Sequence, residues 1–326
     1  MTHATEPRLT DTTSRSTASG RALRLQRYGG ADALVADVVA APAPAPGQVF
    51  VEVKAVGVNG IDWKIREGHL RERFKLALPA TLGIEMAGIV LRTGAGVEKW
   101  ASGDRVMAAL GGVGAYADHV VVDAAKLVAT PAALTDVEAA AIPIAAMTAW
   151  HVIQAAEFDL KGRRVLIHGA AGGVGGFAVQ FAKAAGATVY ATASTGSAAH
   201  VRALGADEVI DYRRERFEQV AGDIDFVVDL VGGDVIDRSW SVLSSDGLLA
   251  SIAAPDVVSR TPDGRRSVFV SNKPDTARLA TIAAQVAVGT LRSTIAEVVG
   301  FDDLAAAIER NRTGHAPGKI VADLTR

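Results

Sequence analysis

The sequence predicts an α/β protein with two domains, a small antiparallel β-barrel and a doubly wound parallel sheet. Three observations lead to this prediction: the chain has 326 residues, its hydrophobic periodicity changes near Pro131, and a glycine-rich loop joins a buried strand to a helix. A chain of this length exceeds one ordinary hydrophobic core. Hydrophobic residues make up 49% of it, which supplies apolar surface for two cores.

Residues 21–128 predict the barrel, because short β-rich runs alternate there with turn signals. The runs include residues 49–53, 88–91, 104–107 and 119–122, and prolines and glycines separate them. Short strands at such spacing are typical of a small antiparallel barrel. Residues 1–20 are rich in Ser and Thr and contain no apolar block, so we expect a flexible tail there.

After Pro131 the pattern changes to strands that alternate with helices. Thr135 and Glu138 have the spacing of a capping box, which predicts a helix start. Strands that alternate with helices form βαβ units and a parallel sheet. Strands are expected at residues 164–168, 188–192, 209–210, 226–229, 247–252 and 319–324, and helices at residues 176–185, 198–204, 278–288 and 301–310.

Charge and composition exclude several kinds of site and partner. The formal net charge is −2, so no electrostatic feature indicates a nucleic-acid or membrane-surface partner. The chain has no cysteine, which excludes disulfides, thiolate nucleophiles and cysteine-ligated zinc. It also lacks the run of about 18 apolar residues that a membrane-spanning helix needs. These features favour a cytoplasmic protein.

A glycine loop at residues 168–175 reads His-Gly-Ala-Ala-Gly-Gly-Val-Gly and lies between a predicted strand and a predicted helix. This is the context that a dinucleotide-binding fingerprint requires. Gly172 lets the backbone approach a pyrophosphate, and Gly175 lets the helix pack on the strand. The helix N-terminus offers N–H groups to the phosphates. We therefore expect a nicotinamide dinucleotide to bind at Gly169, Ala171, Gly172, Gly173, Val174 and Gly175.

The next strand indicates which dinucleotide binds. An NAD enzyme usually places a carboxylate about 20 residues beyond the loop, where it bonds the ribose 2′-hydroxyl. Residues 192–197 read Thr-Ala-Ser-Thr-Gly-Ser and contain none, so we predict NADPH, with Ser194 and Thr195 near its 2′-phosphate. An NAD enzyme that dispenses with the acid is the alternative. The cations available to neutralise a 2′-phosphate are His200, Arg202, Arg213 and Arg214.

Six segments in a fixed order carry a resemblance to a known family. They are residues 58–68, 82–88, 103–106, 114–117, 204–207 and 314–321. With these segments the chain resembles the zinc-independent quinone oxidoreductase and enoyl reductase-like branch of the medium-chain dehydrogenase/reductase superfamily, over residues 21–324. The resemblance implies a GroES-like catalytic domain made of residues 21–142 and 290–326. A Rossmann NADPH-binding domain, residues 143–289, would be inserted between them.

The resemblance also implies a chemistry. Such enzymes reduce quinones, or the activated C=C bond of enones, enals and enoyl thioesters, by hydride transfer, and they are often homodimers. Zinc-dependent relatives carry a cysteine within the segment that matches residues 59–62, and a Gly-His-Glu where residues 83–85 read Gly-Ile-Glu. Both ligands are replaced, so we expect no metal. Conjugate reduction requires hydrogen-bond donors near the developing enolate oxygen and does not require a metal ion there.

Matching positions give the candidate site residues. Asn59 would lie near the nicotinamide, and Asp62 and Lys64 on the same segment would orient the substrate or relay a proton. A turn-forming Asn and a local ion pair are the alternatives for these residues. His168 ends a buried strand and is interpreted as a packing residue. Further cofactor contacts are expected from Thr148, Tyr212, Ala253, Phe269, Asn272 and Lys319.

Two other functions stay open on the sequence. The same cleft would serve a biosynthetic tailoring enzyme or cyclase, and the chain would otherwise bind NADPH without catalysis. Residues 68–75 and 253–266 are expected to shape the mouth of the cleft. Loops set specificity and their conformations do not follow from sequence, so a small-molecule acceptor is predicted without its identity.

Overall fold

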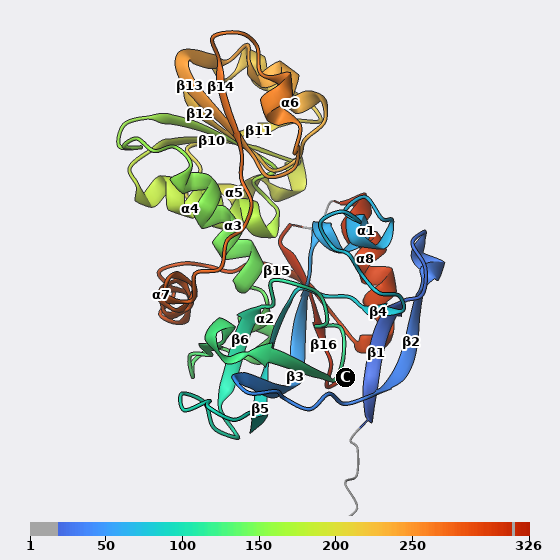
Figure 1. The fold of residues 1–326 in the computed structure, drawn as a ribbon. Coiled ribbons are helices and arrows are strands. Elements are labelled where there is room, and N and C mark those ends of the chain that lie inside the picture. The colour runs from blue at the N-terminus through green and yellow to red at the C-terminus, as the bar shows by residue number, and fades with distance from the viewer. Residues whose placement is uncertain (1–18, 315–316) are drawn as a thin grey trace, which may run out of the picture.

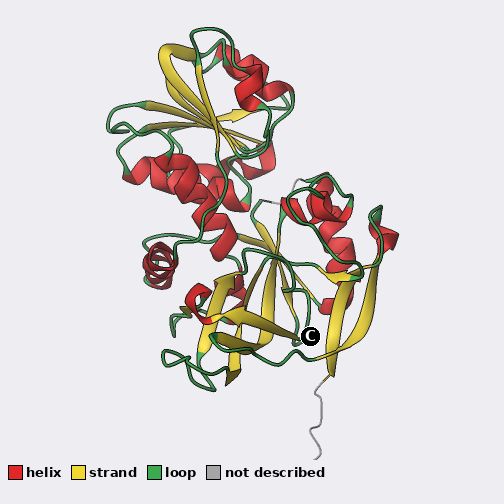
Figure 2. Cartoon of the chain, viewed as in Figure 1, coloured by secondary structure: helices red, strands yellow, loops and turns green. Residues whose placement is uncertain are grey.

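The structure is a computed structural model that describes residues 19–314 and 317–326. Figure 1 and Figure 2 show two domains, one rich in strands and the other a sheet flanked by helices. The first is the GroES-like domain and the second the Rossmann-like domain with its parallel sheet, so the predicted fold class is confirmed. Among the described residues, no helix is long and apolar enough to cross a membrane.

The GroES-like domain is built on a seven-stranded sheet that joins an early segment of the chain to its C-terminal segment. Its strands run in the order β15-β16-β3-β5-β6-β8, and β7 pairs with β3. The late strand β16 pairs antiparallel with β3, so the C-terminal segment completes a sheet begun about 270 residues earlier. The strands are β3 (Gln48–Val58), β5 (Glu85–Thr93), β6 (Arg105–Ala109), β7 (His119–Asp123), β8 (Val128–Ala129), β15 (Ile295–Val299) and β16 (Lys319–Asp323).

A second sheet of three strands begins earlier than expected. β1 (Ser19–Leu25) pairs with β2 (Leu34–Ala40) and with β4 (Ala80–Thr81). The prediction of a tail up to residue 20 is wrong for Ser19 and Gly20, because they pair with Ala40 and Val39. Residues 1–18, together with His315 and Ala316 of the late family segment, lie outside the described residues. The helices of this domain are α1 (Gly60–Arg66), α2 (Asp136–Ala140) and α8 (Leu304–Thr313).

The second domain has six strands that are all parallel to their neighbours. They run in the order β11-β10-β9-β12-β13-β14, which is the order of a dinucleotide-binding sheet. The strand order reverses at β9 and β12, and ligands bind beyond the carboxyl ends of the strands at such a point. The strands are β9 (Arg164–His168), β10 (Thr188–Ala193), β11 (Glu208–Asp211), β12 (Ile224–Asp229), β13 (Leu243–Ser251) and β14 (Arg266–Phe269).

Helices cover both faces of this parallel sheet. Along β9, Val165 and Ile167 are buried in a core shared with α3, α4 and α7, whereas Leu166 is buried in a core shared with α6. Successive side chains of a strand point to opposite faces, so a run that is apolar throughout needs cover on both sides. The helices are α3 (Pro143–Gln154), α4 (Gly173–Ala184), α5 (Ala198–Ala203), α6 (Asp234–Ser239) and α7 (Thr276–Ala287).

Local signals set where the helices begin. Thr135 accepts a hydrogen bond from the Glu138 N–H and closes a capping box at α2, as predicted. Asp275 caps α7 in the same way, through the Arg278 N–H. α4 begins at Gly173, three residues before the predicted start, because the loop backbone turns helical directly after the extended Gly172. The glycine loop thus includes the first turn of α4.

Candidate active site

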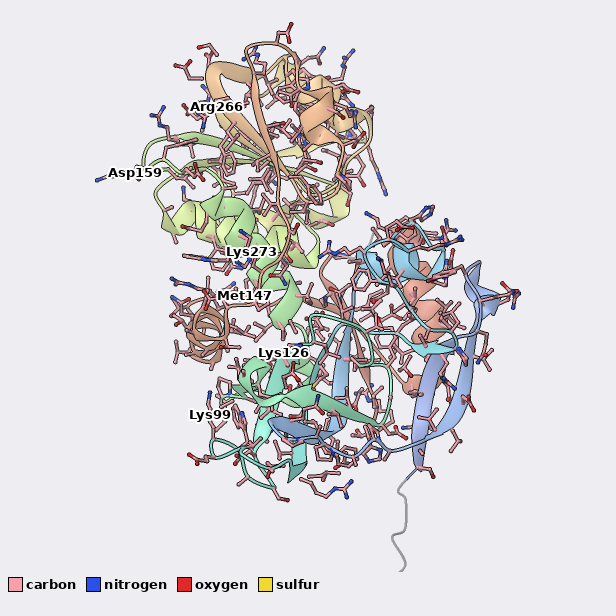
Figure 3. All side chains as sticks on the ribbon, in the orientation of Figure 1. Lys99, Lys126, Met147, Asp159, Arg266 and Lys273 are labelled. Atoms are coloured by element: carbon pink, nitrogen blue, oxygen red, sulfur yellow. The ribbon has the colours of Figure 1, made fainter. Side chains whose placement is uncertain are left out.

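A cavity of about 1780 Å³ is lined by residues of both domains. We call its lining residues from His168 to Phe269 the loop half, and all its other lining residues the barrel half. The barrel half includes Lys126, Met147 and Lys273, which Figure 3 shows along the junction between the two domains. Of the candidate catalytic residues and cofactor contacts proposed from sequence, all line the cavity except Asp62, Thr195 and Lys319.

The glycine loop forms a cradle at one end of the loop half. Gly169 has a φ of +76°, a left-handed conformation that favours glycine. A Cβ on Gly175 would lie 2.7 Å from the Cα of Ala170, so only glycine lets α4 approach the loop this closely. Gly172 is the N-cap of α4 and gives no side-chain cap, which leaves the first-turn N–H groups to the cavity. An anionic diphosphate fits such a helix end.

A chain of hydrogen bonds behind the loop fixes its first peptide group. The Gly169 N–H donates to Thr192 Oγ1, which lies 3.3 Å from His168 Nδ1. His168 Nε2 lies 3.1 Å from Ser239 Oγ, whose own hydroxyl donates to the Val235 carbonyl. Ser239 therefore accepts from Nε2–H, and Nδ1 accepts from Thr192, so the imidazole is neutral. Burial lowers the pKa of His168 to about 4, in agreement with this assignment.

Hydroxyl groups rather than charges line the cavity at the end of β10. Ser194 and Tyr212 line it, and Ser194 Oγ lies 3.2 Å from Ser197 Oγ. Thr195 does not line it, because its hydroxyl donates to the carboxylate of Asp211. That hydrogen bond lowers the pKa of Asp211. Residues 192–197 contain no carboxylate, and the acidic side chains that line the loop half are Glu215 and Asp234.

The cations that sequence reasoning placed near a 2′-phosphate do not line the cavity. His200 Nε2 lies 3.1 Å from Thr294 Oγ1, and Arg213 lies over the ring of Tyr212. Arg238 lines the loop half instead, and its guanidinium donates two hydrogen bonds to Glu218, at 2.7 and 2.9 Å. These bonds lower the pKa of Glu218 to about 2. The positive charge of Arg238 is therefore already paired.

A buried cluster of Asn59, Glu85 and Lys319 lies behind the wall of the barrel half. Glu85 Oε1 lies 2.5 Å from Lys319 Nζ and accepts a 2.8 Å hydrogen bond from Asn59 Nδ2. Lys319 Nζ also donates to Asn59 Oδ1. Glu85 Oε2 accepts the Ile144 N–H at the start of α3, at 2.7 Å. Gly57 makes room for this carboxylate, because a Cβ there would lie 2.7 Å from Glu85 Cδ.

The cluster changes how Asn59 and Lys319 are interpreted. Asn59 lines the cavity, but its oxygen is bonded to Lys319 and its nitrogen to Glu85 and the Gly57 carbonyl. Its amide therefore has no free N–H for an acceptor in this arrangement. The Lys319 side chain lies against the glycine loop, about 3.5 Å from where a Gly173 Cβ would be, and Gly172 pairs with Gly318. The cluster thus joins the barrel to the dinucleotide-binding domain.

Asp62 points away from the cavity and is completely buried. Its Oδ2 accepts hydrogen bonds from the Asn59 N–H, at 2.7 Å, and from the Tyr116 hydroxyl, at 2.6 Å. Burial raises the pKa of Asp62 to about 6, against the lowering effect of the Tyr116 hydrogen bond. A direct contact with substrate does not fit this placement, because the first turn of α1 directs the side chain back to the helix start.

The other proposed residues take part in the cavity wall. Lys64 lines the barrel half, with its ammonium 5.6 Å from the centre of the Trp63 ring. Thr148 and Asn272 line it as well, and Asn272 Oδ1 is buried and has no hydrogen-bond partner among the described residues. Ala253 and Phe269 line the loop half. All of these except Lys64 remain predicted cofactor contacts.

Four residues that hold site residues in place by hydrogen bonds were not predicted from the sequence. Glu85 and Tyr116 lie within family segments, but nothing in the sequence links them to Asn59 or Asp62. Thr192 and Ser239 orient His168 from β10 and α6. Only the spacing of Asn59 and Asp62, which is that of a capping pair, gave a local signal for any of these contacts.

The donor groups in this region are a poor match for zinc. The positions that correspond to the catalytic cysteine segment and the histidine of zinc-dependent relatives hold Asn59 and Ile84, an engaged amide and a hydrocarbon. Zinc is bound by thiolate, imidazole and carboxylate ligands. Within residues 19–314 and 317–326, no group of three or more His, Cys, Asp or Glu side chains is placed to hold a metal ion.

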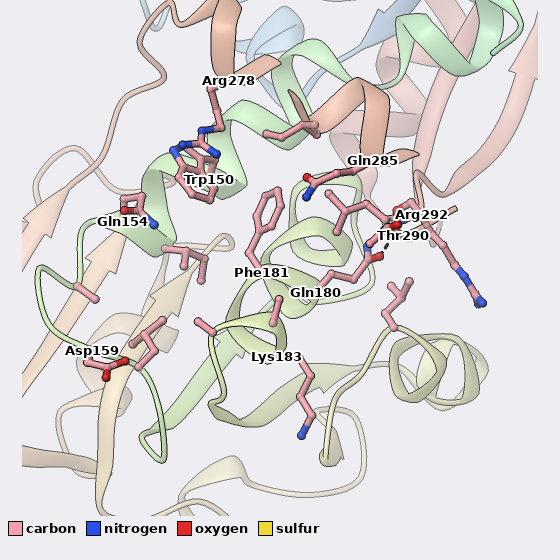
Figure 4. A pocket seen from close by; sticks show the side chains of 18 of the residues that line it. Trp150, Gln154, Asp159, Gln180, Phe181, Lys183, Arg278, Gln285, Thr290 and Arg292 are labelled. Atoms are coloured by element: carbon pink, nitrogen blue, oxygen red, sulfur yellow. Dashed lines mark hydrogen bonds between the residues drawn. The ribbon is translucent and has the colours of Figure 1, made fainter. Parts of the chain in front are cut away.

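A separate groove of about 970 Å³ lies between α3, α4 and α7. Figure 4 shows Arg278 over Trp150, with Phe181 beside them. Gln180 bridges α4 to the segment before β15, through the Arg292 backbone N–H and carbonyl. Because these contacts join α7 and the segment after it to α3 and α4, we assign the groove to the packing of α7 on the sheet.

Comparisons with known proteins match both domains. The chain matches the alcohol dehydrogenase GroES-like domain over residues 45–132 and the zinc-binding dehydrogenase domain over residues 204–321. It is 31% identical to the mouse mitochondrial NAD(P)H oxidoreductase RTN4IP1, with 86% of this chain and 82% of that protein covered. It is 32% identical to the 2-methylene-furan-3-one reductase of Solanum lycopersicum, over 90% and 76% of the two chains.

A solved structure, the quinone oxidoreductase of Coxiella burnetii, is similar along almost the whole fold. Its TM-score is 0.89 and its sequence identity 30%, over 94% of this chain and 100% of that chain. The predicted recognition is therefore confirmed. Family membership implies a nicotinamide cofactor, which the glycine loop fits. The chain belongs to the medium-chain dehydrogenase/reductase superfamily and is an oxidoreductase similar to the quinone oxidoreductases.

Proposed function

We propose that this oxidoreductase uses NADPH, without zinc, to reduce a quinone or the activated C=C bond of an enone, enal or enoyl thioester. One observation carries the proposal: a single cavity has a diphosphate cradle in its loop half and apolar side chains in its barrel half. The apolar side chains are those of Trp63, Leu70, Phe74, Ile84, Ile144 and Met147. Two relatives bear names that describe a quinone and a methylene-furanone acceptor.

The hydroxyl groups beyond β10 support NADPH over NADH. Ser194, Ser197 and Tyr212 line the loop half, where an NAD enzyme would present a carboxylate to the ribose. A 2′-phosphate would accept hydrogen bonds from these hydroxyls. Because Arg238 is already paired with Glu218, the hydroxyls are the main recognition groups in this proposal.

The protein's residues would bind and orient the two reactants. The bound cofactor would supply a hydride to the acceptor. The N-terminus of α4 binds the diphosphate, and Thr148, Ala253, Phe269 and Asn272 flank the cavity between its halves. Of the three proposed catalytic residues, Lys64 has a charged group that lines the cavity, whereas Asp62 acts through Asn59. Orientation and exclusion of water supply the rest of the rate enhancement.

Turnover assays with both cofactors test the proposal. Oxidation of NADPH and of NADH is followed by absorbance with a benzoquinone, an enal, an enone and an enoyl thioester, with and without a chelator. We expect turnover with NADPH, a lower kcat/KM with NADH, and no effect of the chelator. Tight NADPH binding without turnover of any acceptor would favour a non-catalytic or tailoring role. Loss of activity with the chelator would contradict zinc independence.

A variant of the glycine loop tests the cofactor cradle. Gly175→Ala places a Cβ against the backbone of Gly169 and Ala170, which cannot move without shifting α4. We expect NADPH affinity to fall by a factor of about 100 or more, because the helix end no longer reaches the diphosphate. Calorimetric titration measures this loss. Gly222→Ala is the control, since nothing lies within 4 Å of its added Cβ, and it should retain wild-type affinity.

Three further features remain predictions. We retain the homodimer as a prediction: among the described residues β14 is an outer strand of the six-stranded sheet, and sedimentation would test whether two copies associate. A cytoplasmic location and the domain limits at residues 142/143 and 289/290 are likewise retained. The first domain limit is consistent with the start of α3 at Pro143.

A further inference from the structure

The two halves of the cavity differ in charge. Arg238 is the only Lys or Arg of the loop half among the described residues, and Glu215 and Asp234 line that half too. The barrel half has one carboxylate, Asp275, which is engaged as the cap of α7. Its cationic side chains are Lys64, Arg73, Lys126, Lys273, Arg310 and Arg312.

Three of the cations in the barrel half are already neutralised by carboxylates outside the cavity wall. Lys126 pairs with Asp123 at 3.0 Å, and Arg310 pairs with Glu297 at 2.8 Å. Arg312 pairs with Glu309. Their contribution to the potential inside the cavity is therefore reduced by a neighbouring opposite charge.

Lys64, Arg73 and Lys273 have no such partner. Within the described part of the chain none of the three forms an ion pair, and Lys64 and Arg73 lie instead over the rings of Trp63 and Phe74, at 5.6 and 5.5 Å. We call these three residues the free cations. They come from α1, from the turn after it and from the segment between β14 and α7, so they reach the barrel half from separate segments.

The apolar side chains of the barrel half lie among these cations. Trp63 and Phe74 carry Lys64 and Arg73 on their ring faces, and Leu70 lies between them in sequence. A surface that joins aromatic walls to unpaired cations suits a molecule with a conjugated apolar part and an anionic part. A neutral quinone would use the walls and leave the free cations without a role.

We propose that the natural acceptor carries an anionic group, a carboxylate or a phosphate, which Lys64, Arg73 and Lys273 bind at the barrel half. Its unsaturated part lies on the aromatic wall. This inference rests on the proposed reductase function and narrows its acceptor. The diphosphate of the cofactor has its own site at the end of α4, so the free cations are available to the acceptor.

Matched acceptors that differ in charge test this inference. An enone with a terminal carboxylate is compared with its methyl ester, and an enoyl-CoA with the same enoyl group on N-acetylcysteamine. We expect kcat/KM to favour the charged member of at least one pair by about tenfold at low ionic strength, and the preference to shrink with added salt. Preference within the first pair indicates a carboxylate, and preference within the second indicates a phosphate.

A charge-neutral variant gives the second measurement. The triple variant Lys64→Gln, Arg73→Gln, Lys273→Gln should lower kcat/KM more for the charged acceptor than for the neutral one, until the two are nearly equal, with the difference mainly in the KM of the charged acceptor. Lys75→Gln is the control, because Lys75 is exposed directly after the same turn and does not line the cavity. Circular dichroism and the NADPH dissociation constant show whether the triple variant is folded.

The possible outcomes separate this inference from the proposed function. Reduction of neutral acceptors without any preference for charged ones would overturn the anionic acceptor and leave the reductase in place. A triple variant whose main defect is a raised KM for NADPH would assign the free cations to the cofactor and overturn the inference. Absence of turnover with every acceptor would overturn both.

Discussion

The two halves of the cavity are built in different ways. The loop half uses backbone N–H groups, hydroxyls and a neutral imidazole, nearly all placed by β9, β10 and the loop between β9 and α4. The barrel half depends on a buried ion pair, Glu85 with Lys319, whose members lie on β5 and β16. The first half is encoded in one local segment, and the second exists only when distant strands have paired. A local substitution should therefore disturb the loop half, whereas loss of a contact between distant strands should disturb the barrel half.

Breaking the ion pair should give the larger effect on stability. Glu85→Ala leaves the Lys319 ammonium buried without a counter-charge and the Ile144 N–H without its acceptor. Removing one member of a buried pair costs about 3–5 kcal/mol. Urea unfolding measures the loss, and the double variant Glu85→Gln, Lys319→Met should recover most of it.

A surface pair provides the matched control for this cluster. Glu52→Ala removes the partner of Lys54 on the same barrel sheet, where both side chains are partly exposed. An exposed pair is worth about 0–1 kcal/mol, so this variant should unfold almost as the wild type does. If Glu85→Ala and Glu52→Ala lose similar amounts of unfolding free energy, the buried cluster does not stabilise the fold more than an exposed pair does. It would then not be what joins the two domains.

The same contrast explains how far the sequence could predict the site. The glycine loop was recognisable because its strand, turn and helix are contiguous, and all six of the cofactor contacts predicted from it line the cavity. The cluster was not recognisable, since Asn59 and Lys319 are 260 residues apart and meet only through the pairing of β16 with β3. Asp62 was predicted to orient the substrate or relay a proton, with a local ion pair as the alternative, yet its carboxylate turns inward to Asn59 and Tyr116.

The elements of the fold divide in the same way: those with a contiguous signal were predicted, and those that depend on distant partners were not. Periodicity located most strands of the two larger sheets, and β9 occupies the residues expected for it. The strands that it did not predict are β1, β2, β4, β8, β14 and β15. Ser19 and Gly20 were misjudged as tail, because nothing local marks a strand whose partners, Ala40 and Val39, lie twenty residues later. The start of α4 was placed too late, since glycines are poor helix formers and only the geometry of the loop makes Gly173 helical.

The pH dependence of stability should differ in sign between Asp62, which is buried beside the barrel half, and His168, which lines the loop half. Burial raises the folded-state pKa of Asp62 from 3.8 to about 6, so its contribution to stability falls as pH rises through this window. Burial lowers the pKa of His168 from 6.5 to about 4, so its contribution is lost as pH falls through that window. Between pH 4 and 6 the two effects oppose each other.

Two variants separate these opposing effects. From pH 4 to 6, the unfolding free energy of Asp62→Asn should rise relative to wild type, and that of His168→Asn should fall relative to wild type. Each change is on the order of 3 kcal/mol. Urea unfolding at several pH values measures both, and subtraction of the wild-type curve removes the other titrating groups. Two differences of the same sign would show that the halves do not titrate as proposed.

The smallest effect should come from the hydrogen-bond chain behind the glycine loop. Thr192→Val keeps the shape of the side chain but removes the acceptor of the Gly169 N–H and the donor to His168 Nδ1. Each lost bond is worth about 1 kcal/mol, so stability should fall by that order and NADPH affinity by roughly threefold to tenfold. Thr188→Val, at the exposed start of the same strand, controls for the change in β-propensity.

The result would show how the loop half keeps its geometry. If affinity falls while Thr188→Val is unchanged, the first peptide group of the loop is held by Thr192 and, through it, by the neutral imidazole. If affinity is unchanged, the left-handed Gly169 and the packing of Gly175 fix the loop by backbone geometry alone. In that case the geometry of the loop would be encoded within the glycine segment itself, and the contrast with the barrel half would be greater.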